Sequence, residues 1–297
     1  MVKVVLFLLG VLAVGFAVVL IKDLLEHKNQ LEKDTSFVKA AAIGFGTNFL
    51  DALGIGNFAT ATALLRMLNQ IEDRVIPGTL NVGFTLSVIT EAFIFIAAIE
   101  VEPLTLVSMI AAATLGAWIG AGFVSRLPEK KVQQMMGISL LFVVGMMLAG
   151  KFGLMPTGGQ EVGLSGVKLV VAIVVNFFLG ALMTCGIGLY APCMALVYAL
   201  GMSPKVSFPV MFGSCAFLMP VASVRFVKEG AYNRKIALAF STVGILGVIV
   251  AVTLVKSMSL DLLQWLVMAV VLYTALSMLK ASTKKQPVSK TMETELA

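Results

Sequence analysis

Long apolar runs separated by short polar stretches dominate the chain. Runs long enough to cross a lipid bilayer as helices, or nearly so, cover about 4–21, 75–99, 104–125, 133–150, 207–226, 236–256 and 260–279. Two further segments, about 38–65 and 167–200, are longer than a typical span, and glycine breaks each near its middle. Each could cross once as an interrupted helix, or turn back as a hairpin of two half-helices. The pattern predicts an all-α polytopic membrane protein.

The two broken segments repeat each other 132 positions apart. Between 45–77 and 177–209, ten of 33 ungapped positions are identical, where the chain's own composition would give about three. In the first copy these are Phe45, Leu50, Gly54, Ile55, Gly56, Ala59, Ala63, Leu64, Leu68 and Pro77. Paired broken segments, one in each half, indicate the binding site of a secondary transporter. Glycine-mediated packing between membrane helices is the alternative explanation.

The distribution of Lys and Arg predicts how these segments run. If both turn back and the C-terminus is cytoplasmic, the inside holds 17 of these residues and the outside 5. If both cross, the split is 14 against 8. The positive-inside rule therefore favours hairpins. Each repeat then has one hairpin and three crossings, so the second repeat is inverted relative to the first.

This topology divides the chain into five parts. An N-terminal membrane helix and its charged loop (1–37) precede repeat 1 (38–150), an external linker (151–166), repeat 2 (167–279) and a cytoplasmic tail (280–297). The N-terminal run lacks a small-residue cleavage site before the charged segment, so we read it as a helix rather than a signal peptide. The expected location is the cell membrane.

Composition excludes several other functions. Hydrophobic residues make up 59% of the chain and charged residues 13%, with a mean hydropathy of +0.99. The net charge of +6 comes from Lys and Arg between the apolar runs, which argues against a nucleic-acid partner. The three cysteines show no CxxC spacing, and the single histidine, His27, lies in a charged loop. These features predict neither a metal site nor a cofactor.

A break in a membrane helix suits anion binding, because it frees backbone N–H groups and directs a positive helix end at the gap. The second half-helices are expected to begin near Asn57 and Leu189. Helix capping and interhelical hydrogen bonding are the alternative roles for the polar groups nearby. The candidate substrate-binding residues are Asn48, Gly54, Gly56, Asn57, Thr60, Thr184, Gly186, Gly188, Tyr190, Pro192 and Cys193.

Two acids are candidates for coupling transport to protons. Asp51 lies three residues before the first break, and Glu91 lies well inside the run 75–99. Ionisable groups at membrane depth are costly and indicate function. The alternative is structural: Asp51 caps the broken helix, and Glu91 pairs with Arg66 or Arg225. In the second copy the matching residues are Met183 and Ser223, so a coupling acid would belong to one half only.

The arrangement resembles the TauE/SafE family of sulfite and organosulfonate exporters. The residues that carry this resemblance are Gly54, Gly56 and Gly78-Thr79 in the first copy, and Gly186, Gly188, Pro192 and Gly213-Ser214 in the second. Asn57 and Leu189 stand where a third glycine is common in the family, and Thr60 replaces the first-copy proline. These departures bear on the substrate more than on the fold.

The resemblance implies an alternating-access transporter that exports sulfite, sulfonates or thiosulfate. The alternatives are an anion channel or a carrier of another small organic anion. An intramembrane enzyme is disfavoured, because no Ser/His/Asp set, HExxH motif or aspartate pair appears in the apolar runs. The expected partners are a small anionic substrate, the lipid bilayer and, for a homodimer, a second copy of the chain.

Overall fold

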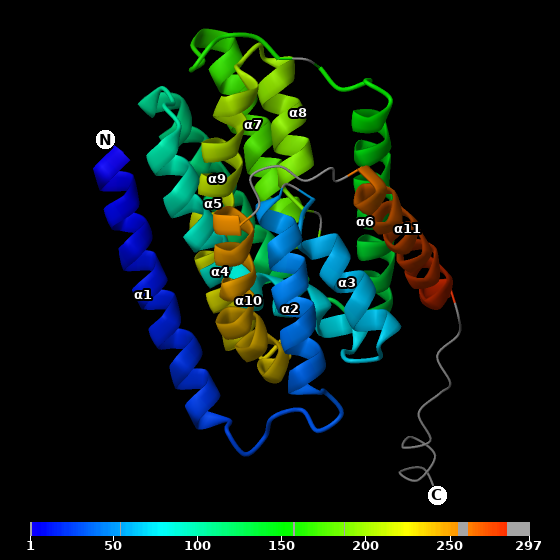
Figure 1. Cartoon of the computed structure of the whole chain (residues 1–297). Helices are drawn as coiled ribbons and strands as arrows, with labels where there is room; N and C mark the ends of the chain where they lie inside the picture. Colours follow the sequence, from blue (N-terminus) through cyan, green and yellow to red (C-terminus); the bar gives the residue numbers. More distant parts are fainter. Residues whose placement is uncertain (1, 54, 157, 187, 255–260, 284–297) are drawn as a thin grey trace, which may run out of the picture.

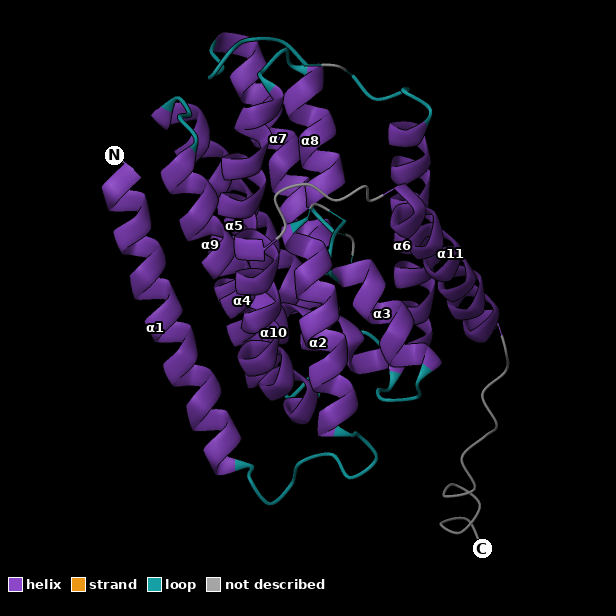
Figure 2. Ribbon diagram, viewed as in Figure 1, coloured by secondary structure: helices purple, strands orange, loops and turns teal. Residues whose placement is uncertain are grey.

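The computed structural model describes residues 2–53, 55–156, 158–186, 188–254 and 261–283, and its elements are helices (Figures 1 and 2). Two short 3-10 turns (Asp73–Val75 and Pro204–Val206) precede α4 and α9. The helices are α1 (Val2–Glu26), α2 (Phe37–Ala52), α3 (Phe58–Met67), α4 (Ile76–Ala98), α5 (Pro103–Val124), α6 (Glu129–Lys151), α7 (Gly166–Met183), α8 (Tyr190–Ala199), α9 (Ser207–Lys228), α10 (Arg234–Leu254) and α11 (Asp261–Thr283).

The two glycine-broken segments form hairpins. At the base of the first, Thr35 Oγ1 donates to the Gln70 carbonyl at 2.9 Å, and the Ser36 N–H donates to Gln70 Oε1 at 2.8 Å. At the base of the second, Lys168 Nζ donates to the Leu200 carbonyl at 3.1 Å. Each segment therefore returns to the end of the bundle where it began. In Figure 1 the α2–α3 hairpin occupies the lower half of the bundle and the α7–α8 hairpin the upper half.

Helix bounds recur at the same spacing as the sequence identities. Shifted by 132 positions, the bounds of α3 coincide with those of α8, and the bounds of α6 coincide with those of α11. The hairpin tips differ in backbone detail, since the left-handed φ falls at Gly56 (+92°) in the first and at Gly186 (+90°) in the second. These two positions are not equivalent in the repeat. Gly54, the counterpart of Gly186, lies outside the described residues.

The centre of the bundle is formed by α4 and α9. In their apolar 18-residue stretches, 67% and 78% of the residues are buried. Outside them, α7 packs on α5 and α2 packs on α10 at very short range. A Cβ at Gly116 would lie 1.9 Å from the Phe177 carbonyl oxygen, and one at Gly247 would lie 2.2 Å from that of Phe45. Glycine at these positions lets two helix backbones touch, as is common between membrane helices.

Seven helices of the described chain are long and apolar enough to cross a membrane. Six of them correspond to predicted spans. The seventh is α7, which we expected as half of a hairpin and did not count as a span. The remaining predicted span, 260–279, corresponds to α11, which continues to Thr283 and so takes the first residues of the predicted tail. The rest of that tail, 284–297, lies outside the described residues.

Candidate functional site

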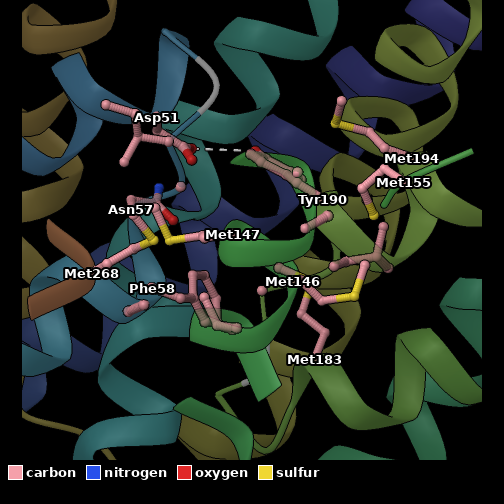
Figure 3. A pocket seen from close by; sticks show the side chains of 18 of the residues that line it. Asp51, Asn57, Phe58, Met146, Met147, Met155, Met183, Tyr190, Met194 and Met268 are labelled. Atoms are coloured by element: carbon pink, nitrogen blue, oxygen red, sulfur yellow. Dashed lines mark hydrogen bonds between the residues drawn. The ribbon is translucent and has the colours of Figure 1, made fainter. Parts of the chain in front are cut away.

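A cavity of about 490 Å³ lies where the tips of the two hairpins meet (Figure 3). One side is formed by the break between α2 and α3 and by the start of α8. The other side is formed by α6 and α11, which pack against each other. The cavity extends along α6 as far as Lys151 and Met155, toward the end of the bundle where the 152–165 linker lies. A site between two broken helices is therefore present in the fold.

The N-termini of both ten-residue half-helices face this cavity. Residues 57–59 and 189–191 line it. The first intrahelical bonds run from Ala61 N to Asn57 O at 2.8 Å and from Cys193 N to Leu189 O at 3.0 Å. The N–H groups before these bonds have no acceptor within their own helix. Two positive helix ends therefore converge on one space, which favours a negatively charged ligand.

Tyr190, at the start of α8, joins the two hairpins through the acids predicted for coupling. Its hydroxyl lies 3.2 Å from Asp51 Oδ2 and 3.3 Å from Glu91 Oε2. Both acids are fully buried, and Asp51 lines the cavity. A tyrosine hydroxyl has one proton to donate, so only one of the two carboxyl groups can receive it at a time. Asp51 Oδ1 and Glu91 Oε1 have no hydrogen-bond partner among the described residues.

The alternative pairing of Glu91 with a basic residue is wrong. Arg66 binds Asp73, with 2.6 Å between Nε and Oδ1, and also donates to Ser277. Arg225 lies over the ring of Trp118 at 4.8 Å. Both arginines are thus engaged away from the cavity, and the described partner of Glu91 is Tyr190.

Most of the other predicted polar residues are bonded within the hairpins. Asn57 lines the cavity and donates from Nδ2 to Asn48 Oδ1 at 3.2 Å, which links α3 to α2 across the break. Thr60 Oγ1 donates to the carbonyls of Gly56 at 2.9 Å and of Asn57 at 3.0 Å. Thr184 Oγ1 donates to the Ala181 carbonyl at 2.7 Å. Thr60 and Thr184 thus bond within their own segments.

Pro192 and Cys193 are buried on α8 and are not among the cavity-lining residues. Among the described glycines of the two tips, only two line the cavity. At Gly56 and Gly188 an added Cβ would meet no atom within 4 Å. At Gly186 it would lie 2.7 Å from Met136 Cε, so this glycine serves the turn and its packing. Of the predicted residues, the cavity brings together Asp51, Gly56, Asn57, Gly188 and Tyr190.

Sequence reasoning missed most of the cavity wall. Six methionines line it: Met146, Met147, Met155, Met183, Met194 and Met268. Lys151 also lines it, with Nζ 6.0 Å from the centre of the Trp265 ring. No spacing motif joins these residues, and the only available signal was the chain's total of 17 methionines. Within the described part of the chain, no group of three or more His, Cys, Asp or Glu side chains could hold a metal ion.

A polytopic helical bundle with a cavity between two broken helices is an arrangement typical of secondary transporters. The family described as "Sulfite exporter TauE/SafE" matches residues 2–148 and 168–296, which is nearly the whole chain. The protein therefore belongs to the TauE/SafE family, whose members are membrane transporters of sulfur-containing anions and not enzymes. The two matched segments are separated at the linker between α6 and α7. No curated protein and no solved structure gave a match.

Proposed function

We propose that the protein exports small sulfur-containing anions, such as sulfite, sulfonates or thiosulfate, by alternating access. The observation that carries this proposal is the convergence of the N-termini of α3 and α8 on one cavity. Backbone N–H groups can hold the anion there without a buried lysine at the hairpin tips. Family membership supports the sulfur-anion class of substrate.

Two inverted repeats, 38–150 and 167–279, would supply the two alternating states. The recurrence of helix bounds at a spacing of 132 positions supports this arrangement. So does the entry of the two hairpins from opposite ends of the bundle (Figure 1). The excess of Lys and Arg in the loops supports a cytoplasmic location for the C-terminus and for the α3–α4 and α5–α6 connections.

A carrier is favoured over a channel by the shape of the cavity. Its described lining reaches Lys151 at one end of the bundle, but does not include the cluster of Arg66, Asp73 and Gln133 at the other. In that cluster Gln133 Nε2 on α6 donates to Asp73 Oδ2 at 3.0 Å, and Asp73 also binds Arg66 of α3, so α6 and the first hairpin share one carboxylate. A cavity whose described lining reaches only one end of the bundle is expected of a carrier.

Asp51 and Glu91 are the proposed proton carriers. Two buried carboxyl groups that share one tyrosine hydroxyl repel each other strongly if both are charged. A proton on this pair would also reduce the repulsion between Asp51 and an anion at the hairpin tips. Substrate and proton would then occupy the site together, which is the basis of coupled transport.

Reconstituted vesicles with an imposed pH gradient test this mechanism. Asp51→Asn and Glu91→Gln mimic the protonated state, so they should abolish proton-driven accumulation of sulfite while retaining sulfite exchange. The control is Glu229→Gln, which removes an exposed ion pair with Arg126 far from the cavity and should leave both modes intact. Accumulation by both cavity variants along the gradient would show that these acids do not couple transport. Absence of counterflow exchange in the wild type would instead indicate a channel.

A further inference from the structure

The described wall of the cavity is unusually rich in methionine. Six of the 20 described lining residues are methionines, whereas the whole chain has 17 in 297 residues. They come from α6, α7, α8, α11 and the linker after α6, so several parts of the fold converge to build this wall (Figure 3). Val88, Val143 and Phe58 add further apolar surface.

Few polar side chains are among the described lining residues: Asp51, Asn57, Lys151 and Tyr190. Asp51 and Lys151 are the only charged side chains in the described lining. The Asn57 amide is bonded to Asn48, and the Tyr190 hydroxyl faces the two acids. A bare inorganic oxyanion carries hydrogen-bond acceptors on every side, and those facing a thioether wall would lose their water without replacement. The surface formed by the methionines therefore suits carbon better than oxygen.

The volume of the cavity also favours an organic ligand over a small inorganic anion. Water takes up about 30 Å³ per molecule in the liquid. The cavity of about 490 Å³ therefore has room for a ligand much larger than an anion of four or five heavy atoms. Cavities in this range hold organic ligands, with apolar walls and a few orienting polar groups. Methionine side chains are flexible and polarizable, so they can adapt to apolar groups of different shape.

We infer that the preferred substrate is an organic anion with an apolar body, and this inference rests on the proposed transport function. Its acidic group binds at the N-termini of α3 and α8. Its carbon body lies along the methionine wall, where Met147 and Met194 contribute from α6 and α8. Lys151 lines the cavity at the C-terminal end of α6.

A series of linear alkanesulfonates from methyl to butyl tests the inference. Binding to the full-length protein in lipid nanodiscs is measured by calorimetry, and empty nanodiscs correct for partition into lipid. Affinity should rise about fourfold for each added methylene group, the value expected for moving one such group from water to an apolar site. Sulfite, which has no carbon, should bind more weakly than butanesulfonate by at least tenfold.

The methionine wall is tested by substitutions that keep its volume. Met147→Gln and Met194→Gln together should flatten the dependence on chain length, because a polar wall no longer favours the added carbon. The matched control is Met67→Gln, since Met67 is 51% exposed at the far end of α3 and does not line the cavity. This variant should keep the fourfold steps.

Two outcomes would overturn the inference, and they are distinguishable. If sulfite and every alkanesulfonate bind with equal affinity, the apolar wall does not contact the substrate, yet the proposed function stands. If neither sulfite nor any alkanesulfonate binds, and vesicles exchange none of them, the proposed function fails together with the inference.

Discussion

Replacing Gly188 by leucine separates the binding role of a tip glycine from a packing role. Gly188 lines the cavity, an added Cβ would meet no atom within 4 Å, and its backbone is not left-handed. The new Cβ therefore displaces no protein atom and does not strain the turn, and the rest of the side chain can extend into the cavity. We expect the free energy of unfolding to change by less than about 1 kcal/mol, as for substitutions away from packed sites.

The expected effect on binding is much larger. The four added carbon atoms would occupy the space beside the first N–H groups of α8, where the anion is proposed to bind. A hydrogen bond to a charged group contributes about 1.5 kcal/mol or more. Loss of two such bonds at the lower figure would weaken anion binding by about 150-fold.

Calorimetric titration and thermal unfolding of the same purified variant measure both quantities. Gly116→Leu is the packing control, because its Cβ would lie 1.9 Å from the Phe177 carbonyl oxygen, and it should lower the unfolding temperature strongly or prevent folding. A folded Gly188→Leu protein with wild-type affinity would refute the assignment of the anion site. Gly56 is less suited to this test, since its φ of +92° makes any side chain strained.

Two further predictions concern topology and acid stability. On a cysteine-free background, Asn69→Cys and Pro128→Cys should be protected from an impermeant maleimide in intact cells. Leu154→Cys, at a position that is 75% exposed, should react. Labelling of both Asn69→Cys and Pro128→Cys would contradict the proposed orientation. Hydrogen bonds from Thr105 hold the pKa of Glu102 below its usual range. These bonds therefore stabilise the folded protein above about pH 4.3, and this stabilisation is lost as the pH falls through the lowered pKa. Glu102→Gln should therefore weaken the pH dependence of the unfolding temperature in acid, and an unchanged profile would exclude this contribution.

Local features of the chain could be predicted from sequence because they depend on neighbouring residues. The half-helices were expected to begin near Asn57 and Leu189, and these residues immediately precede α3 and α8. Glycine at the break and apolar runs of bilayer length are signals of the same local kind.

Contacts between the hairpins could not be predicted in this way. Tyr190 and Asp51 are 139 positions apart, and their meeting depends on how two hairpins dock inside the bundle. The same holds for the methionine wall, where Met147 and Met268 face one cavity from different helices. Glu91 could be recognised as an unusual buried acid, but the sequence offered two arginines as partners and did not single out Tyr190.

The glycine contacts hold α5 close to α7 and α2 close to α10, whereas α6 and α11 form a separate pair. With backbone against backbone at Gly116 and Gly247, no side chain is available to change rotamer, so each pair should move as one rigid piece. The paired α6 and α11 contact α3 and α8 instead. Tilting of that pair would move Met146, Met147 and Met268 relative to the hairpin tips. That movement would change the shape of the cavity, because its two sides belong to different groups of helices.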